Sequence, residues 1–511
     1  MKFGFKSKKI INEKFADKFF LKLKKNKKII QCHGVFDLVH PGHLRHFLYC
    51  KSIGEILVVS ITSDKFIKKG IYRPLVPENL RAINLAAIEM VDYVIINRKN
   101  TPYSLIKKIK PNFFAKGLEY SSQNSINKNL TNKEKKIVES YGGKLIFTPG
   151  DFVNSSSKII DYYPPDLKFE KLKLLMDTEN IKFDDLIKCI KQLKKIKITV
   201  IGDIIVDTVS NCKVIGGLHK TPTLSVQVTD NKDYIGGAAI VAAHLRGFSD
   251  NVEIISTLGN DKKGNFVKKE LNKLGIKKKI FYENNRPTTN KNSFYAQKHK
   301  LIKIDTVNNS YINDETLNLM IDELKKCKSD IIFFSDFRHG IFNNQTVRKF
   351  LNSINYKKSF LVADSQVASR WGNILDFKNF NLITPTENEA RLALFEQDLG
   401  IRPLATKLLQ KSNSKNLIMK LGERGLIALS RSRKSDYISL DPFVKNLVDS
   451  NGAGDALLAY SATSLFKTNS LIISSIIGIL AASCKCEMEG NIPVTLNILE
   501  NKIKEIYRFF N

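Results

Sequence analysis

The residues best suited to chemistry lie at positions 32–43, where the sequence reads CHGVFDLVHPGH. This segment follows the apolar pair Ile29-Ile30 and precedes a predicted helix that begins near Leu44, so it is a loop between a strand and a helix. Backbone N–H groups and the positive end of the helix dipole bind polyphosphate at such a place. His40 and His43 can donate hydrogen bonds to phosphate oxygens that gain charge as a phosphoanhydride breaks. Two surface histidines in a turn are the simpler alternative, but four accompanying residues favour a nucleotide site: Gly34, Phe36, Asp37 and Gly42.

Further polar residues follow later predicted strands. Arg81 opens the helix at residues 81–89, and Lys116-Gly117 comes directly after the strand at residues 113–115. Ser155 and Ser156 precede a final helix, whose start they can cap while also holding an anion. Each residue alone is explained by solvent exposure or capping. Because the carboxyl ends of parallel strands meet at one edge of a sheet, together they predict a phosphate-binding crevice.

A second candidate site lies at residues 451–455, where NGAGD precedes the apolar helix at residues 456–465. Small residues at a helix start allow backbone N–H groups to approach a phosphate closely. Asp455 can take a proton from an attacking hydroxyl group. A turn would explain one glycine but not this whole motif, so the segment predicts a second phosphate site.

Two segments alternate short apolar strands with amphipathic helices, a pattern typical of parallel α/β sheets. Residues 28–163 have the size of a small Rossmann-like nucleotide-binding domain. Residues 196–511 predict a larger α/β domain. A basic N-terminal extension (residues 1–27) precedes the first domain, and a linker with a first helix (residues 164–195) separates the two.

Composition narrows the classes of function. The 511 residues carry a formal charge of +32, but the lysines are spread along the chain, so we expect compositional bias and no nucleic-acid partner. Seven cysteines without metal spacing indicate reduced thiols. No signal peptide is evident, and the longest apolar stretch, residues 471–483, is too short to span a bilayer. We therefore expect a soluble, cytoplasmic protein without a membrane partner.

The first segment resembles the cytidylyltransferase-like nucleotidyltransferases, and in detail the adenylyltransferase half of bifunctional heptose enzymes of lipopolysaccharide precursor synthesis. The matching stretches are residues 34–43, Ser63-Asp64, Arg73-Pro74, Leu80-Arg81, residues 91–94, Thr101-Pro102, Pro111 and Lys116-Gly117. The resemblance implies that a phosphate monoester attacks the α-phosphorus of ATP or CTP and that pyrophosphate leaves. It makes His40, His43 and Lys116 catalytic and has Arg81, Gly117 and the serines at 155 and 156 contact phosphates. Mg²⁺ would offset the polyphosphate charge.

The second segment resembles the ribokinase-like (PfkB-type) carbohydrate kinases from about residue 197 onward. The matching marks are Gly202-Asp203, Asp207, residues 236–239, residues 257–261, residues 335–337, Thr384-Pro385, Glu389, residues 422–425 and residues 452–455. The resemblance implies a central sheet between helices, with a small lid near residues 222–234. It also implies transfer of the ATP γ-phosphoryl group to a sugar hydroxyl, with Asp455 as the base.

The same resemblance distributes the remaining roles. Phosphate and nucleotide contacts fall on Gly422, Gly425, Asn451, Gly452, Ala453 and Gly454, of which the last three form the anion hole. Sugar contacts fall on Asp207, Gly236, Gly237 and Asp336, and Glu389 acts on Mg²⁺ indirectly. In the heptose enzymes the kinase half precedes the transferase half, whereas the order is reversed here.

Four positions depart from the kinase pattern. Ile240 stands where such kinases have an asparagine after GGAA, Thr386 replaces the asparagine of TPN, and Asn451 replaces the threonine before GAGD. The stretch at residues 335–340, SDFRHG, lacks the lysine that the heptose enzymes have near this point. Because a pocket built around a hydroxyl discriminates strongly once its polar partner changes, these departures imply a changed sugar or a weakened kinase.

The leading hypothesis is a bifunctional, sugar-activating enzyme that phosphorylates a heptose-like sugar and makes a nucleoside-diphosphate sugar for surface-glycan or lipopolysaccharide assembly. One alternative is a CTP-dependent cytidylyltransferase acting on a polyol phosphate. Another treats the second domain as a non-catalytic module that binds a sugar or nucleotide. Nucleic-acid binding rests on charge alone. The resemblance also suggests a homodimer formed through the lid.

Overall fold

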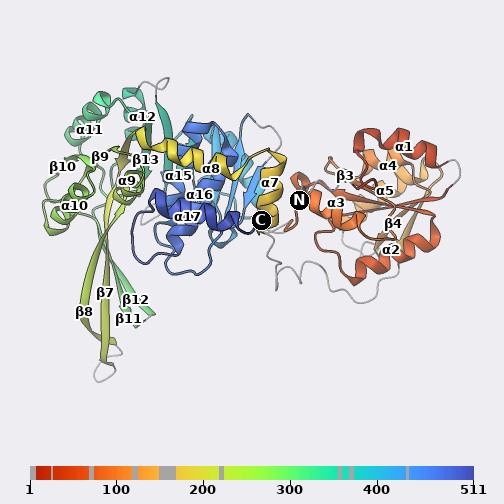
Figure 1. Ribbon diagram of the computed structural model, residues 1–511, viewed down its shortest axis with the longest axis horizontal. Coiled ribbons are helices and arrows are strands. Elements are labelled where there is room, and N and C mark those ends of the chain that lie inside the picture. The colour runs from red at the N-terminus through yellow and green to blue at the C-terminus, as the bar shows by residue number, and fades with distance from the viewer. Residues whose placement is uncertain are drawn as a thin grey trace. The chain divides into compact units, whose positions relative to one another are not determined.

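The computed structural model describes residues 7–24, 27–67, 74–117, 125–148, 168–217, 224–297, 299–354, 359–366, 373–432 and 437–510. The chain divides into two compact units, residues 1–167 and residues 168–511 (Figure 1). Both units alternate helices with mostly parallel strands, which confirms the expected α/β class.

The first unit is built on a parallel sheet with the strand order β3-β2-β1-β4-β5. Its elements are η1 (Glu13–Phe15), α1 (Ala16–Leu23), β1 (Ile29–Gly34), α2 (Pro41–Ile53), β2 (Ile56–Thr62), η2 (Asp64–Phe66), α3 (Glu78–Ala86), β3 (Tyr93–Asn97), α4 (Tyr103–Ile109), β4 (Phe113–Gly117), α5 (Ser125–Glu139) and β5 (Lys144–Thr148). The strand order reverses between β1 and β4. Loops at the carboxyl ends of these two strands therefore border the crevice where such sheets bind ligands.

Residues 7–24 form part of this unit, which differs from the expected N-terminal extension. Ala16 and Phe20 of α1 are fully buried and pack in one core cluster with Ile29. The backbone N–H of Ile11 donates to the carbonyl of Val94 at 2.9 Å, so the segment also borders β3. The lysines between the apolar residues obscured an amphipathic helix, whose charged face is exposed while its apolar face packs.

The second unit is built on a larger sheet with the strand order β10-β9-β6-β13-β14-β15-β16-β17-β18, in which β17 pairs antiparallel with both of its neighbours and the other pairs are parallel. Its strands are β6 (Lys197–Gly202), β7 (Ile204–Gly217), β8 (Leu224–Gly237), β9 (Asn251–Thr257), β10 (Lys277–Phe281), β11 (Asn290–Ala296), β12 (His299–Thr306), β13 (Ile331–Asp336), β14 (Phe360–Ser365), β15 (Leu382–Ile383), β16 (Asn416–Lys420), β17 (Leu426–Ser430) and β18 (Tyr437–Leu440). Its helices are α7 (Lys168–Thr178), α8 (Phe183–Lys191), η4 (Gln192–Lys195), α9 (Ala238–Arg246), α10 (Lys262–Lys273), α11 (Asp314–Lys326), α12 (Asn344–Ser353), η5 (Ile374–Asp376), α13 (Glu387–Leu394), α14 (Ile401–Ser412), η6 (Gly422–Arg424), α15 (Ala453–Thr468), α16 (Leu471–Cys486) and α17 (Leu496–Tyr507).

Helices cover both faces of this sheet, which makes three layers (Figure 1). One core cluster joins the sheet to α7, α8, α9, α10, α15, α16 and α17, and the other joins it to α11, α12, α13 and α14. Successive residues of β6 enter opposite cores, with Val200 in the first and Ile201 in the second. Because both faces of the strand are buried in these cores, side chains that face a ligand have to come from the strand ends.

A separate sheet with the order β12-β11-β7-β8 projects from the second unit, and we call it the lid sheet (Figure 1). β7 and β8 pair along their whole length, from Ile204 opposite Gly237 to Gly217 opposite Leu224. β11 and β12 widen this ribbon beyond the strand pair expected from the sequence.

The structure also differs from the expected linker at residues 164–195. Residues 168–195 form α7, α8 and η4, and their buried side chains Leu172, Leu186 and Leu193 belong to the core of the second unit. The expected helix is therefore present, but the segment is part of the second unit instead of a linker.

Among the described residues, no helix is long and apolar enough to cross a membrane. The most apolar one, α16, is instead buried in the second unit. All seven cysteines are free thiols.

Candidate functional sites

The first site lies at residues 34–43, which we call the HPGH loop. This segment runs from the last residue of β1 into the first turn of α2. His40 is the N-cap of α2, and its Nδ1 accepts a hydrogen bond from the backbone N–H of Gly42 at 3.1 Å. Because that nitrogen is an acceptor, the neutral ring carries its proton on Nε2. The loop thus sets the tautomer in which His40 can donate from Nε2 to a phosphate oxygen.

Two glycines allow the loop to close on its rings. A Cβ at Gly42 would lie 2.8 Å from Cε1 of His40, and a Cβ at Gly34 would lie 3.0 Å from the ring of Phe36. Phe36 itself has a φ of 48° and stands edge-on to His43, with ring centroids 4.9 Å apart. Any larger residue at either glycine would displace a ring of the site.

His43 lies against His40, with ring centroids 3.9 Å apart. Burial, together with the neighbouring rings of His40 and His46, lowers the pKa of His43 to about 3. His43 is therefore neutral at physiological pH and can form hydrogen bonds without carrying a charge.

Arg81 differs from the expected phosphate contact. Its side chain is fully buried and forms an ion pair with Asp64 at 2.6 Å. The other guanidinium bonds go to backbone carbonyls of Val35, Thr62 and Val76. Because the guanidinium is committed to these acceptors, Arg81 fastens the HPGH loop to β2 and α3 instead of facing a ligand.

Asp37 also holds the loop rather than a nucleotide. Its carboxylate is buried and accepts hydrogen bonds from the backbone N–H groups of Leu75 and Val76 at 2.9 and 2.8 Å. The expected contact with a nucleotide is thus corrected to a supporting role. Both carboxylate oxygens already accept backbone hydrogen bonds, and a carboxylate repels a phosphate.

Lys116 is the next-to-last residue of β4, which pairs with β1 where the strand order reverses. Its ammonium forms an ion pair with Glu134 of α5 and donates to Thr131 at 3.3 Å. His33 lies close by, and burial together with the charge of Lys116 lowers the pKa of His33 to about 4. The sequence reading missed Glu134 and His33. Gly117 follows Lys116, while Ser155 and Ser156 lie outside the described residues.

The second site lies at the carboxyl edge of the large sheet, where α15 begins. Gly452 precedes the helix with a φ of 78°, a left-handed conformation that favours glycine. Lys420 at the end of β16 contacts both carboxylate oxygens of Asp364 at 2.8 and 2.9 Å. A Cβ at Gly454 would lie 3.5 Å from the ammonium of Lys420. Lys420 and Asp364, which no sequence signal singled out, therefore border residues 452–455, the GAGD loop.

Asp455 is buried in the first turn of α15. Burial and the charge of Asp364, opposed by Lys420, raise the pKa of Asp455 to about 7. A carboxyl group that titrates near neutral pH is well suited to accept a proton during catalysis.

Thr386 and Glu389 form a capping box at the start of α13. The Thr386 hydroxyl accepts from the backbone N–H of Glu389 at 3.3 Å, and the Glu389 carboxylate accepts from the backbone N–H of Thr386 at 2.7 Å. Burial raises the pKa of Glu389, which also lies within the electrostatic reach of Lys420 and Asp364. The threonine thus anchors Glu389 beside the second site despite replacing the asparagine of the family pattern.

Asp207 of β7 lies at the base of the lid sheet. A Cβ at Gly236 would lie 2.3 Å from its carboxylate oxygen, which explains the glycine opposite it. Asn491 donates to Asp207 at 3.2 Å and to the carbonyl of Ile235 at 3.0 Å. Gly237 has a φ of 60° and precedes α9. Asn491 was not identified from the sequence, because it lies in a short loop without a motif.

Asp336 differs from the expected sugar contact. It is fully buried, pairs with Arg338 at 2.9 Å and accepts from the hydroxyl of Ser365 at 2.7 Å. Ile240 is equally buried in α9 within the core. Both side chains are buried in the interior of the second unit and support the fold around the site.

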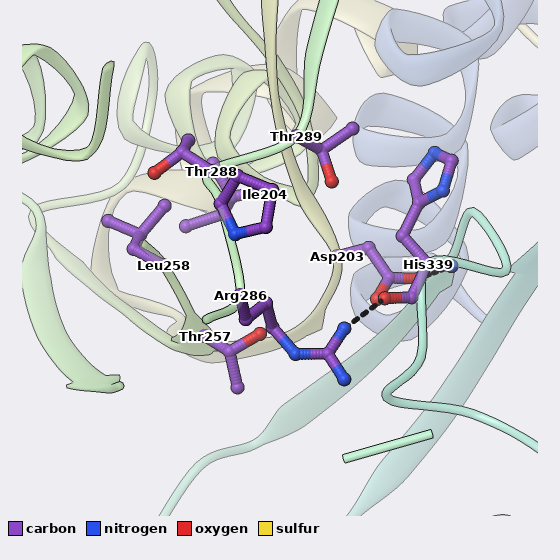
Figure 2. A pocket seen from close by; sticks show the side chains of 9 residues that line it. Asp203, Ile204, Thr257, Leu258, Arg286, Thr288, Thr289 and His339 are labelled. Carbon is purple, nitrogen blue, oxygen red and sulfur yellow. Dashed lines mark hydrogen bonds between the residues drawn. The ribbon is translucent and has the colours of Figure 1, made fainter. Parts of the chain in front are cut away.

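Figure 2 shows a small pocket beside Asp203, between Arg286 and His339. Asp203 accepts hydrogen bonds from the backbone N–H groups of Phe337, His339 and Ile341. Arg286 donates to the carbonyl of His339 at 3.2 Å. Asp203, which is adjacent to β7, therefore ties the end of β6 to the loop after β13.

Gly422 and Gly425 enclose the turn between β16 and β17, with φ values of 63° and 79°. A Cβ at Gly425 would lie 1.9 Å from the carbonyl oxygen of Leu440, so the backbone there approaches β18 closely. Asn451 is exposed, and its backbone N–H donates to Asp449 at 3.0 Å.

The sheet between two helical layers, the projecting lid sheet and a glycine-rich start of α15 beside Asp455 define a sugar-kinase type of domain. Residues 195–496 match the model of the pfkB family of carbohydrate kinases, and the chain belongs to that family. Residues 32–162 match the cytidylyltransferase-like model, so a nucleotidyltransferase-like domain precedes the kinase domain.

The chain is also similar to proteins named bifunctional protein HldE. The HldE of a Nitratiruptor species is 37% identical over 123 residues, which cover 24% of this chain and 26% of that protein. The HldE of Helicobacter pylori is 40% identical over 114 residues, which cover 22% and 24%. The match falls on the cytidylyltransferase region, and the chain spans about a quarter of the length of these relatives.

Among solved structures, phosphofructokinase-2 from Escherichia coli in complex with fructose-6-phosphate has a TM-score of 0.50 and 14% sequence identity. The match covers 61% of this chain and 100% of that one. At this identity the likeness concerns the fold alone.

Proposed function

We propose that the chain is a bifunctional, sugar-activating enzyme: its first unit transfers a nucleotidyl group to a sugar phosphate, and its second unit phosphorylates a sugar. The pairing of the HPGH loop with a GAGD loop in one chain carries this proposal. The products would serve nucleotide-sugar synthesis for a surface glycan or lipopolysaccharide.

In the first unit, a phosphate oxygen of the sugar phosphate would attack the α-phosphorus of ATP or CTP. The bond from that phosphorus to the bridging oxygen breaks, and pyrophosphate leaves with the electron pair. His40 and His43 are placed to donate to oxygens that gain charge, and no proton has to be removed from the attacking phosphate. Lys116 would exchange its ion pair with Glu134 for a contact with the polyphosphate.

In the second unit, a sugar hydroxyl would attack the γ-phosphorus of ATP while Asp455 takes its proton. The bond to the β-phosphate oxygen breaks and ADP leaves. The backbone N–H groups of residues 452–454 would hold the transferred group, and Lys420 lies at the same helix start to balance its charge.

Mg²⁺ suits the oxygen donors beside the second site. Among the described residues no group of three or more His, Cys, Asp or Glu side chains is arranged to hold a metal ion. Asp364 and Glu389, which lie within electrostatic reach of each other, fit an ion that keeps water and nucleotide phosphates as its main ligands. Such an ion would offset the charge of the ATP phosphates.

The acceptor of the kinase half would carry an anionic group. Lys291 of β11 stands opposite Asp207 in the lid sheet, and burial with the nearby charge of Lys303 lowers its pKa. The same two lysines act on His339, whose pKa burial lowers to about 3. Lys291 and Lys303 bring two cations near Asp207, where Lys303 also pairs with Asp305 at 3.6 Å, and these cations can bind an anionic group of the acceptor.

The direct test supplies the purified chain with ATP or CTP and a panel of sugars, sugar 1-phosphates and other sugar phosphates. We expect pyrophosphate release with a sugar 1-phosphate and ADP release with a different sugar phosphate. Folded protein that releases neither product across the panel would contradict the proposal.

The second candidate is a CTP-dependent polyol-phosphate cytidylyltransferase whose kinase-like unit only binds a ligand. The buried Ile240 favours it, because the family asparagine is missing from the acceptor side. Its signature would be CTP turnover with glycerol phosphate and no ADP release. ADP release that depends on Asp455 would remove it.

We also propose a homodimer formed through the lid sheet. Ile302 and Ile304 lie two residues apart on β12, so they share one face of the strand, and both are exposed. Val214 of β7 and Val228 of β8 are exposed on the same ribbon. Light scattering should give twice the mass of the 511-residue chain, and Ile302→Lys should yield monomers.

A further inference from the structure

Lys485 is a buried cation that the proposed chemistry does not use. It lies near the end of α16, and its relative exposure is 0%. Its ammonium reaches the carbonyl of Met488 only at 3.5 Å, the far limit of a hydrogen bond. A buried ammonium is costly unless opposite charge stands nearby, so its position demands a partner.

That partner is the GAGD loop and the residues before it. A Cβ at Gly452 would lie 2.5 Å from Oδ1 of Asn491 and 3.5 Å from Cε of Lys485, so the lysine side chain packs beside Asn491 against Gly452. The carboxylates of Asp449 and Asp455 favour the charged form of Lys485 and oppose the lowering of its pKa by burial. The positive charge of Lys485 therefore lies beside Gly452 in the interior of the second unit.

The same helix end also holds the loop mechanically. The carbonyl of Cys486 accepts hydrogen bonds from the backbone N–H groups of Val448 and Asp449 at 2.8 and 3.1 Å. The Asp449 carboxylate in turn accepts from the backbone N–H of Asn451 at 3.0 Å. The end of α16 therefore fixes the chain that leads into Gly452, and Lys485 lies within this network.

We propose that Lys485 is a positioning residue that acts as an internal cation of the GAGD loop, holding the loop ready for the γ-phosphate of ATP. The inference rests on the proposed kinase function of the second unit. ATP places a γ-phosphate on the loop and ADP does not, so Lys485 should strengthen the binding of ATP more than that of ADP.

The test is hydrogen exchange of the full chain, read on peptides that cover residues 448–465, with Mg²⁺ and increasing ATP or ADP. Reading these peptides separates the second unit from any nucleotide bound by the first. In Lys485→Met we expect the ATP concentration for half-protection to rise about tenfold, as for a lost bond to a charged group, with the ADP value unchanged.

Lys502→Met is the matched control. Lys502 of α17 is also buried, with 4% relative exposure, but its ammonium pairs at 2.7 Å with the carboxylate of Glu487, the residue that follows α16. This variant should lose stability while keeping the ATP and ADP values of the parent. In Lys485→Ala, ethylammonium should restore the ATP value, because it can occupy the vacated space as a cation.

The outcomes separate the two proposals. If the parent chain shows no ATP protection of these peptides, ATP binding by the second unit fails and the role of Lys485 fails with it. If the parent is protected by ATP and Lys485→Met behaves like it, only the internal cation is refuted. If the variants weaken the binding of ATP and ADP equally and ethylammonium does not restore it, Lys485 has only a structural role. That outcome would also refute the proposed internal cation.

Discussion

The HPGH loop and the GAGD loop both lie at a helix start beside the carboxyl ends of parallel strands, yet they differ in their charges. The first presents the neutral imidazole of His43, because burial keeps its pKa near 3. The second gathers buried carboxylates and lysines, and the pKa of Asp455 rises to about 7. The difference matches the chemistry proposed for each, since a phosphate monoester attacks without losing a proton whereas a hydroxyl must lose one.

The sharpest test of this contrast is a crossed pair of variants. Asp455→Asn should reduce ADP release by about a thousandfold, because the base that takes the hydroxyl proton is lost. His43→Ala should reduce pyrophosphate release by about a hundredfold or more. Each variant should leave the other activity unchanged in coupled assays of both products. Loss of both activities from either variant would show that the two sites are not independent.

A large effect on stability is expected from Arg81, which pairs with Asp64 and donates to the carbonyl of Val35 in the HPGH loop. Arg81→Met should lower the free energy of unfolding of the first unit by about 3–5 kcal/mol, since it leaves Asp64 buried without its ion-pair partner. Arg98→Met serves as control, because Arg98 is exposed and its ion pair with Glu78 is 3.8 Å long. Denaturant titration should detect a change below about 0.5 kcal/mol for the control.

The two activities should also respond differently to pH. Asp455 must be ionised to act as a base, so kcat/KM for ADP release should rise with pH and level off above about 7. Pyrophosphate release should have no titration of His43 between about pH 5 and 8, because its pKa lies near 3. Initial rates across this range measure both, and a shared acid limb would contradict the contrast.

The same pKa has a consequence for stability. The folded pKa of Asp455 near 7 exceeds its unfolded value of about 3.9, so the folded state holds the proton more tightly. The stability from this group is complete below about pH 4 and is lost as pH rises through about 7. Asp455→Asn should therefore raise the melting temperature at about pH 8 and leave it unchanged at about pH 4, as measured by calorimetry.

The smallest expected effect concerns the capping box of α13. Thr386→Ala should cost about 1 kcal/mol of stability and raise the KM for ATP several-fold, because Glu389 loses part of its anchor. Asn313→Ala removes a comparable cap from α11, where Asn313 accepts from the backbone N–H of Thr316. It should have the same stability cost without the change in KM.

Sequence reasoning located both glycine-rich loops, since helix-start chemistry is local and leaves a contiguous signature. It failed where the partner comes from a distant element. Arg81 looked like a free phosphate ligand, but its carbonyl partners are spread over residues 35–76. Lys420 and Asp364 carried no motif, because only the sheet order brings them to the site, and Asn491 comes from the loop between α16 and α17. Lysine-rich composition concealed the helix at residues 16–23 and the packing of residues 168–195 on the second unit.

β7 and β8 give the second unit a long lever. β7, which carries Asp207 near its base, is 14 residues long in all, about 45 Å of extended chain, with β8 paired along it. A small rotation at the base is therefore magnified along the ribbon. A reporter on an outer residue of the ribbon, such as Thr229, would register occupancy of a site that it never touches.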